Sequence, residues 1–403
     1  MRALNALRIG LLTHSVNPRG GVVHTLELAR ALHEAGHEVT VFAPARPGES
    51  MFRASPCRIA LACIEGEATG LTGMVAQRIR ALKRALVDVG PDRFDVLHAQ
   101  DSIGGNALAE LKEECAIRGF VRTVHHLDCF DDPQLDHWQR RAWQDADAVF
   151  CVSDAWTRIM RSTYGITAHT VSNGIDATRY GVRADADTHA LRERFGIGGG
   201  PVVLAVGGIE ERKNTSMLLE AFALLRARRP GAQLVLAGGA SLLDHDDYTR
   251  RFLTRAAALG LEVGARGTPV IVTGALPDAA MPALFRLADA VSMVSLREGF
   301  GLVVLEALAS GRPVVVSRIA PFTEYLDDRT CTFADPYDAS SIAAALAYAI
   351  HGNSGIDFVQ AVPALLRRFT WQASAARHLD LYRAWLETDQ PSSGALTCPS
   401  CTS

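Results

Sequence analysis

The chain has 403 residues, of which 48% are hydrophobic, and it carries 41 Lys and Arg against 44 Asp and Glu. This length favours two compact domains that each bury a core, and the small net charge of −3 argues against a protein built around nucleic-acid phosphates. The sequence contains neither a secretory signal pattern nor an apolar run of about 20 residues. We therefore expect a cytoplasmic protein, with peripheral contact at the inner face of the membrane left open.

The N-terminal half alternates strand-like and helix-like segments. Residues 7–14 and 37–44 are apolar and predict strands, and the amphipathic segment 22–36 between them predicts a helix that ends at Gly36. Further apolar runs predict strands at residues 95–100, 120–126 and 147–153. Continuous apolar character with little alternation is typical of parallel strands that are covered on both faces.

A second series of the same kind follows a polar, turn-rich segment at residues 171–189, which we interpret as the hinge between two domains. Its strands are predicted at residues 201–209, 232–240, 268–276, 289–295 and 312–317. We expect an α/β protein with two Rossmann-like domains whose parallel sheets face each other across a cleft. The predicted ranges are 1–172 for the N-terminal domain, 173–370 for the C-terminal domain, 371–388 for a helix that crosses back to the N-terminal domain, and 389–403 for a disordered tail.

The stretch REGFGLVVLEALASGRPVVVS, residues 297–317, contains two glutamates eight positions apart. A strand, a glycine loop and a helix place backbone N–H groups and the positive end of a helix dipole at one point, an arrangement that suits phosphate. Glu298 lies at the mouth of this loop, whereas Glu306 lies inside the helix, where a carboxylate needs a partner. The two hydroxyls of a ribose would satisfy Glu306, and an ion pair with a distant arginine is the alternative.

This stretch resembles the signature of the retaining family-4 glycosyltransferases of the GT-B fold. The resemblance extends to VSNGID, to GGIEERKN and to the FTW segment before the last helix, and it covers essentially the whole chain apart from the tail. It implies that Glu298 contacts hydroxyls of the transferred sugar as a catalytic residue, and that Glu306 holds the ribose. It also implies that the sugar and diphosphate are bound by the backbone of the loop and helix start, at Gly299, Phe300, Gly301, Leu302 and Val303.

The resemblance assigns further residues outside this stretch. His125 matches the family's histidine near the donor sugar, and His126 and Asp128 follow it closely. Gly20 and Gly21, which we place between the first strand and the first helix, match glycines where the backbone approaches the donor closely. Without the resemblance, a lone histidine at a strand end and a glycine pair in a βα turn are more often structural.

A departure from the family pattern concerns the phosphate-binding cations. Lys213 matches the family's phosphate-binding lysine, but Gly208 stands where the family commonly has an arginine. Arg212 is the neighbouring cation that could supply the missing charge. An exposed charge at a helix start is the alternative interpretation of Arg212.

Two other features carry weaker signals. Basic residues beside an apolar stripe can dock on anionic lipid, although a solvated helix face is commoner; here they are Arg78, Arg80, Lys83 and Arg84. Cys398 and Cys401 supply only two of the roughly four ligands that a structural zinc site needs. We therefore expect a reduced cytoplasmic protein without a metal site or a cofactor.

The sequence favours a metal-independent retaining glycosyltransferase that moves a hexosyl-type sugar from a nucleoside-diphosphate donor to a small molecule, lipid or glycan acceptor. The alternatives are a nucleotide-sugar 2-epimerase of the same fold and a non-catalytic nucleotide-sugar-binding protein. No nucleic-acid partner is expected. The donor base, the sugar, the acceptor and the oligomeric state have no readable signal, and we expect acceptor recognition in N-terminal loops such as residues 51–72.

Overall fold

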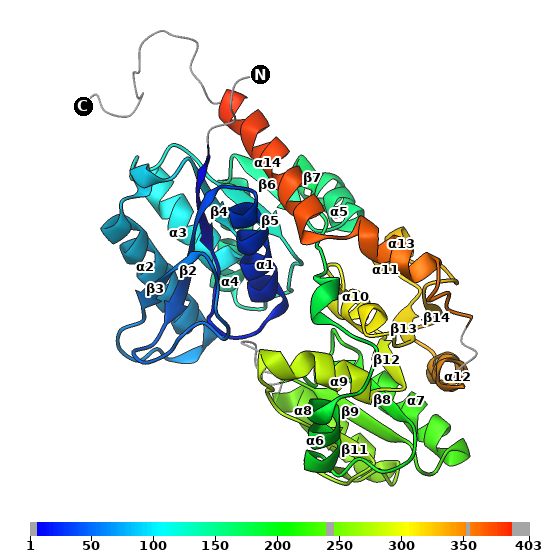
Figure 1. Ribbon diagram of the computed structural model, residues 1–403. Helices are drawn as coiled ribbons and strands as arrows, with labels where there is room; N and C mark the ends of the chain where they lie inside the picture. Colours follow the sequence, from blue (N-terminus) through cyan, green and yellow to red (C-terminus); the bar gives the residue numbers. More distant parts are fainter. Residues whose placement is uncertain (1–5, 239–245, 352–354, 389–403) are drawn as a thin grey trace.

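The computed structural model describes residues 6–238, 246–351 and 355–388, so Cys398 and Cys401 lie outside the described residues. Within this part the chain forms two seven-stranded sheets in which every strand pairing is parallel. Helices connect successive strands, as parallel pairing requires. The predicted α/β architecture with two Rossmann-like domains is confirmed (Figure 1).

The N-terminal sheet has the strand order β3-β2-β1-β4-β5-β6-β7. Its strands are β1 (Arg8–Leu12), β2 (Glu38–Ala45), β3 (Arg58–Cys63), β4 (Val96–Ala99), β5 (Val121–Val124), β6 (Ala148–Cys151) and β7 (Ala168–Thr170). The helices of this domain are α1 (Gly20–Glu34), α2 (Gly70–Val89), α3 (Ser102–Glu113), α4 (Pro133–Gln144) and α5 (Asp154–Tyr164), with a 3₁₀ turn at Pro91–Arg93.

Two edge strands of this sheet were not predicted. The segment 51–72, expected to be a loop, contains β3, which pairs with β2 from Arg58 to Cys63. Its exposure alternates irregularly, and Leu61 is 43% exposed, so the continuous apolar signal of a central strand is missing. β7 at the other edge has only three residues, too few to give a pattern.

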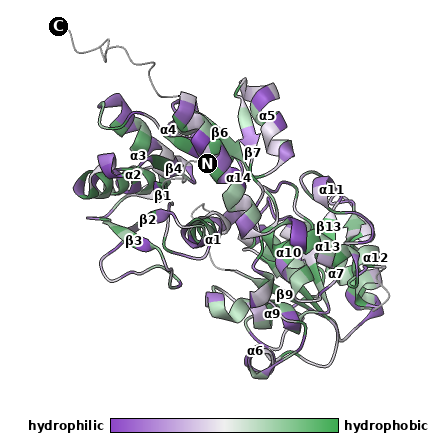
Figure 2. Cartoon of the chain, turned by 45° about the horizontal axis from the view of Figure 1, so that its top comes forward, coloured by the Kyte–Doolittle hydropathy of each residue, from purple (hydrophilic) through white to green (hydrophobic). Residues whose placement is uncertain are grey.

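The C-terminal sheet has the order β10-β11-β9-β8-β12-β13-β14. Its strands are β8 (Val202–Val206), β9 (Gln233–Ala237), β10 (Val263–Gly264), β11 (Val270–Val272), β12 (Ala290–Met293), β13 (Val314–Ser317) and β14 (Thr332–Ala334). Its helices are α6 (Ala186–Arg194), α7 (Thr215–Arg228), α8 (Asp246–Ala258), α9 (Met281–Leu287), α10 (Leu302–Ala309), α11 (Phe322–Tyr325), α12 (Ala339–Ile350) and α13 (Ala361–Arg368). Short 3₁₀ turns lie at Ala177–Arg179 and Asp278–Ala280. Hydrophobic colour follows the strands and α10 in Figure 2.

The chain passes between the domains twice, and the two passages lie side by side. Ile175 bridges Thr370, and the N–H of Ile175 donates to the carbonyl of Phe369 over 3.0 Å. A Cβ on Gly174 would lie 2.3 Å from the nitrogen of Trp371, so only glycine allows this approach. The two segments that connect the domains therefore contact each other at Gly174 and Trp371.

The last helix, α14 (Trp371–Thr388), packs on the N-terminal domain alongside α1 (Figure 1). Its buried side chains Trp371, Leu379 and Tyr382 belong to the same hydrophobic core as Ile9 and Leu26. The hydroxyl of Tyr382 lies 2.6 Å from Nδ1 of His98 on β4, inside this core. Because α14 follows the strands of the C-terminal sheet in sequence but packs on the N-terminal domain, it connects the two domains.

Buried histidines line the contact between α1, β4 and α14. His24, His98 and His378 are each 0% exposed, and the His24 ring lies 5.3 Å from the Trp371 ring. Nδ1 of His24 is 2.9 Å from Oδ1 of Asn173 at the hinge. Burial, together with repulsion between the histidines, lowers the pKa of His24 to about 3 and that of His98 well below its usual range. Burial also lowers the pKa of His378 to about 4.

We expect the free energy of unfolding to fall as the pH drops below about 6.5, the unfolded-state pKa of histidine. The folded state keeps these histidines neutral while the unfolded state protonates them, so acid favours unfolding. Three such groups can contribute a slope of up to about 4 kcal/mol per pH unit. Urea unfolding between pH 5 and pH 7.5 measures the slope, and His378→Phe should reduce it. A free energy of unfolding that is flat across this range would contradict the prediction.

Candidate active site

Two cations converge on Glu298 at the carboxyl ends of adjacent strands. The carboxylate Oε2 lies 2.8 Å from Nζ of Lys213 and 3.2 Å from Nη1 of Arg212. The Ser295 hydroxyl lies 3.4 Å from the same oxygen. Lys213 comes from the loop between β8 and α7, whereas Glu298 comes from the loop between β12 and α10, and β8 pairs with β12. The strand order therefore brings these two loops together.

The charge state of Glu298 follows from this contact. Burial opposes ionisation, but Lys213 and Arg212 outweigh it and hold the pKa of the Glu298 carboxyl well below its usual range. Burial lowers the pKa of Lys213, against the attraction of Glu298. Glu298 is therefore an ionised hydrogen-bond acceptor near neutral pH and cannot serve as a proton donor.

The glycine loop after Glu298 is pressed against the N-terminal domain. A Cβ on Gly299 would lie 2.2 Å from the carbonyl oxygen of His125, so a larger residue would separate the two domains here. The indole nitrogen of Trp156 on α5 donates to the carbonyl of Glu298 over 3.0 Å. The Leu302 side chain packs against the cores of both domains. The predicted donor loop is thus also an interdomain contact.

Aromatic packing fixes the conformation of this loop. The Phe300 ring is 4% exposed and stacks on Tyr325, with ring centroids 4.9 Å apart and 7° between the planes. The Tyr325 hydroxyl donates to the carbonyl of Phe300 over 2.8 Å. Gly301 has a φ of +95° and caps α10, whose first turn begins with Leu302 and Val303. The first N–H groups of α10 lack partners within the helix, as at any helix start.

Glu306 is held by a neutral partner. The Tyr180 hydroxyl donates to its Oε1 over 2.8 Å, and among the described residues Glu306 forms no ion pair. The alternative of an ion pair with an arginine is therefore wrong, since the nearby Arg179 binds Asp278 at 2.8 Å. Burial raises the pKa of Glu306, although Tyr180 and Arg179 oppose the rise. The sequence analysis missed Tyr180, which follows the NGID motif by only a few positions.

His125 ends β5 and faces the start of α1. Its Nε2 lies 3.2 Å from Oε1 of Gln100, and its ring lies 4.6 Å from that of His24. A Cβ on Gly21 would be 3.8 Å from Cδ2 of His125. Burial lowers the pKa of His125 well below its usual range, and neighbouring His24 and Arg122 add to the effect, so the ring is neutral.

One detail differs from the sequence-based expectations. Gly20 and Gly21 form the first turn of α1 instead of a linker before it, because α1 begins at Gly20. Asp128, which follows His125 and His126 in sequence, lies 3.5 Å from Nε2 of His126. The structure therefore brings Gly21 and His125 together, and it brings Glu298, Arg212 and Lys213 together.

Comparison with known proteins identifies the family. The family model described as Glycosyltransferase Family 4 matches residues 18–179, and the one described as Glycosyl transferases group 1 matches residues 187–358. The D-inositol 3-phosphate glycosyltransferase of Arthrobacter sp. strain FB24 is 30% identical over 72% of this chain and 71% of its own length. This chain belongs to the family-4 glycosyltransferases.

Other relatives agree with this assignment. The GDP-mannose-dependent alpha-(1-6)-phosphatidylinositol monomannoside mannosyltransferase of Mycolicibacterium smegmatis is 28% identical over 83% of this chain and 87% of its own length. The mannosylfructose-phosphate synthase of Agrobacterium fabrum is 31% identical over 50% of this chain, which spans only 44% of that relative. Anabaena HepE, solved in complex with UDP and glucose, covers 94% of this chain with a TM-score of 0.72 and 18% identity, which shows the GT-B fold.

Gly208 of this glycosyltransferase lines a small cavity together with Lys213, Gly207, Ser292 and Met293. Arg212 directly precedes Lys213 in sequence, and it contacts Glu298 as Lys213 does. Position 208 therefore carries no cation, but two cations from the same loop contact Glu298.

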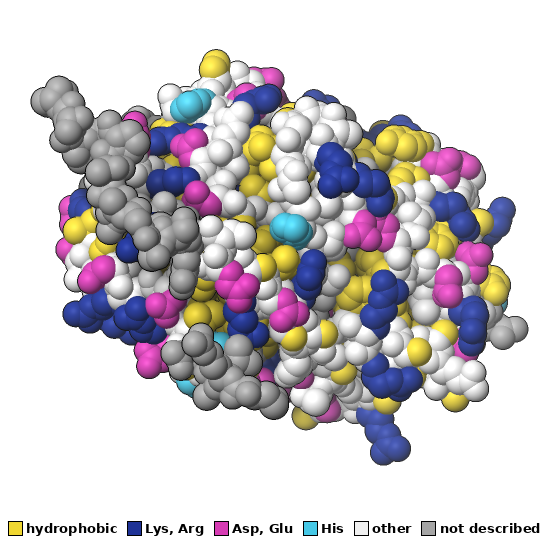
Figure 3. All heavy atoms as spheres, turned by 90° about the horizontal axis from the view of Figure 1, so that it is seen from above, with side chains coloured by type: hydrophobic (Ala, Val, Ile, Leu, Met, Phe, Trp, Pro, Cys, Tyr) yellow, Lys and Arg dark blue, Asp and Glu magenta, His cyan; other side chains and the backbone are white. Residues whose placement is uncertain are grey.

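Two of the four basic residues of α2 form ion pairs. Lys83 binds Glu114 at 2.5 Å and Glu110 at 3.1 Å, and Arg84 binds Glu65 at 3.2 Å. This pairing favours a solvated helix face over lipid docking. Both signs of charge are also interspersed on the face of the molecule shown in Figure 3. No helix in the described part of the chain has both the length and the apolar character needed to cross a bilayer.

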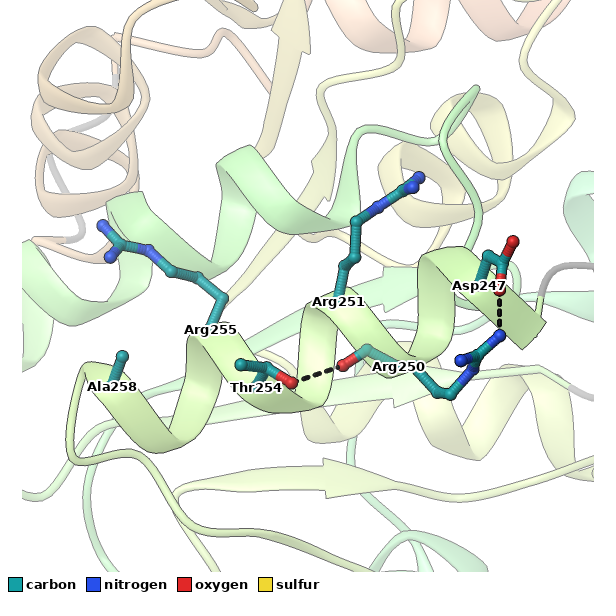
Figure 4. A pocket seen from close by; sticks show the side chains of 6 residues that line it. All are labelled: Asp247, Arg250, Arg251, Thr254, Arg255 and Ala258. Atoms are coloured by element: carbon teal, nitrogen blue, oxygen red, sulfur yellow. Dashed lines mark hydrogen bonds and ion pairs between the residues drawn. The ribbon is translucent and has the colours of Figure 1, made fainter.

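A hollow of about 670 Å³ lies along α8, and its lining residues do not include Glu298, Arg212 or Lys213 (Figure 4). Two of its arginines are already paired, Arg250 with Asp247 and Arg255 with Glu220. Within the described ranges, no group of three or more His, Cys, Asp or Glu side chains has an arrangement suited to a metal ion. Metal independence itself stays a prediction.

Proposed function

We propose that this glycosyltransferase moves a hexosyl group from a nucleoside-diphosphate sugar to an acceptor hydroxyl, with retention of configuration and without a metal ion. The observation that carries the proposal is the 2.8 Å contact between Lys213 and Glu298 beside the start of α10. In a nucleotide sugar, the diphosphate is bonded directly to the sugar. Its binding site therefore needs cations and a hydroxyl-binding carboxylate side by side.

The nucleotide half of the donor has a matching position on α10. Glu306 lies in the second turn of the helix and is half-buried, and burial opposes the ionised form of its carboxylate. A ribose offers two hydroxyl donors to one carboxylate, which would offset the cost of keeping Glu306 ionised there. The name of the Mycolicibacterium smegmatis relative includes GDP-mannose, and HepE was solved with UDP. Both nucleotides carry the ribose and diphosphate, so these names support the donor class and leave the base open.

The proposed reaction forms a bond between the acceptor oxygen and the anomeric carbon while the bond from that carbon to the phosphate oxygen breaks. The acceptor proton passes to the departing phosphate, and both groups occupy the same face of the sugar, which retains the configuration. Lys213 and Arg212 stabilise the charge that develops on the diphosphate, a role that a bound metal ion fills in other enzymes. Ionised Glu298 and neutral His125 hold sugar hydroxyls.

A panel of UDP-, GDP- and ADP-sugars tests the proposed function. We expect one nucleotide series to raise the melting temperature and to be hydrolysed slowly in the absence of acceptor, with EDTA making no difference. Proton NMR of the first sugar product should show the anomeric configuration of the donor. Release of a 2-epimer without any acceptor would identify an epimerase, and donor binding with no turnover for any acceptor or water would identify a binding protein.

Glu306→Gln should weaken donor binding without weakening the fold. The substitution removes the charge that strengthens the ribose hydrogen bonds, so the donor Kd should rise about tenfold or more. Since burial disfavours the ionised form of Glu306, removing the charge should leave the melting temperature of the free protein unchanged or higher. Calorimetric titration and thermal melting measure both quantities. A clear loss of stability with unchanged donor affinity would make Glu306 a structural residue.

Lys213→Ala should lower kcat by about 10²–10³, the scale for removing one preorganised charge stabiliser. Arg212→Ala should cost less, unless Arg212 has taken the role of the arginine that is absent at Gly208. Gly208→Arg should partly restore the kcat of Lys213→Ala, because residue 208 lines the same small cavity as Lys213. Steady-state rates of the three single variants and the double variant decide among these outcomes. A near-normal kcat for Lys213→Ala would place the phosphates elsewhere.

A further inference from the structure

Three arginines of the N-terminal domain lie at the carboxyl edge of its sheet. Arg19 directly precedes α1, and Arg46 directly follows β2. Arg78 lies in the first half of α2, the helix that follows β3, and side chains of a helix tilt toward its N-terminus. Carboxyl ends of parallel strands share one edge, so all three arginines are directed to the edge where β5 ends in His125.

Arg78 has unused hydrogen-bonding capacity. Its Nε and Nη1 atoms are buried, and neither has a hydrogen-bond partner among the residues that the structure describes. A buried N–H group that lacks a partner is costly, and a charged one is more so. Natural sequences keep such a group mainly where a ligand or water supplies the partner.

The carboxylates near Arg78 are already engaged. Glu49 and Asp101 are the acidic groups whose charge acts on the pKa of Arg78, while Arg19 and Arg46 act in the opposite direction. Glu49 accepts the backbone N–H of Arg46 over 2.8 Å. Asp101 accepts the N–H of Gly104 over 2.8 Å as the cap of α3, and its other oxygen lies 3.2 Å from Nδ1 of His14.

A second buried arginine shares Asp101 with Arg78. Arg122 on β5 is 3% exposed, and within the described part of the chain its Nε and Nη1 also have no hydrogen-bond partner. Burial lowers its pKa to about 10, with Asp101 as the main opposing charge. One carboxylate thus faces two guanidinium groups and His14, so the positive charge at this edge is not offset by Asp101 alone.

We infer that Arg78 and Arg19 form a binding site for a phosphate group carried by the acceptor. The inference rests on the proposed function, in which the N-terminal domain binds the acceptor. The donor diphosphate has its own cations, Arg212 and Lys213, in the other domain, so an anion at Arg78 belongs to the second substrate. A guanidinium group presents paired N–H donors that match phosphate oxygens.

The phosphate could belong to a soluble sugar phosphate or to the headgroup of a phosphatidylinositol lipid. Both present the same oxygens to Arg78, and Arg122 behind Asp101 would keep the site positive in either case. The names of three relatives contain fructose phosphate, inositol phosphate and phosphatidylinositol. These names are compatible with the site but do not select between the two sources.

The test compares Arg78→Gln with Arg80→Gln, a matched change on the exposed side of the same helix. The probes are inorganic phosphate and myo-inositol 1-phosphate, titrated calorimetrically into the full chain saturated with the nucleotide that binds best. We expect wild type and Arg80→Gln to bind both probes, and Arg78→Gln to bind them at least about tenfold more weakly. Arg78→Lys, which keeps one charge without the paired donors, should be intermediate.

Equal phosphate affinity in wild type and folded Arg78→Gln, or no phosphate binding by the nucleotide-saturated wild type, would overturn the inference. Thermal melting of every variant shows whether it is folded, and Arg78→Lys replaces Arg78→Gln if the latter is not. Donor titrations of the same samples separate the two proposals. A wild type that binds donor but no phosphate refutes the phosphate site alone, whereas a wild type that binds no donor refutes the proposed function on which the inference rests. The source of the phosphate follows from what displaces bound inorganic phosphate. Displacement by myo-inositol 1-phosphate but not by phosphatidylinositol vesicles indicates a soluble acceptor. Displacement by phosphatidylinositol vesicles but not by phosphatidylcholine vesicles indicates a lipid.

Discussion

The contact between Gly299 and the carbonyl of His125 determines how closely the two domains approach. Only a hydrogen atom fits between the Gly299 backbone and this oxygen, since a Cβ would lie 2.2 Å from it. The approach brings the loop of Glu298 from one sheet against the end of β5 from the other. Trp156 and Leu302 reinforce it from either side. The candidate site therefore draws its residues from two separate cores.

The two glutamates on either side of this contact have opposite electrostatic environments. Glu298 is surrounded by Lys213 and Arg212, so it stays ionised even though it is buried. Tyr180 and Arg179 favour the ionised form of Glu306, but burial dominates and raises its pKa. Glu298 is thus paired with two cations inside the protein, whereas Glu306 accepts a hydrogen bond from the neutral Tyr180 hydroxyl. One carboxylate is held ionised by neighbouring charges, and the other has its ionised form opposed by burial.

The hinge and the last helix explain how a two-domain chain keeps this geometry. Both passages of the chain meet at Gly174 and Trp371, and α14 continues into the core beneath α1. The contact His98–Tyr382 and the contact His24–Asn173 are buried and made by neutral rings. Asn173 belongs to the hinge itself, so the histidine cluster links the docking of α14 to the point about which the domains would turn.

The sequence determined the fold class, the positions of the central strands along the chain and the family to which the chain belongs. Long apolar runs and the REGFGLVVLE motif are local features, so they can be read without any knowledge of packing. The placement of Lys213 before α7 and of Glu298 before α10 was likewise readable, because both follow predicted parallel strands. The edge strands β3 and β7 could not be read, since an edge strand is short and partly exposed and gives no continuous apolar signal.

Only the tertiary structure decided which side chains meet. Tyr180 lies 126 positions before Glu306, and Arg78 and Asp101 come from different helices, so no periodicity connects these residues. The four basic residues of α2 look alike in sequence, yet Lys83 and Arg84 are paired with glutamates while Nε and Nη1 of Arg78 are buried without a hydrogen-bond partner among the described residues. Burial and charge pairing depend on groups that are distant along the chain. They are set by the packing of whole elements, which is why a linear pattern identifies the chemistry and the folded chain assigns the partners.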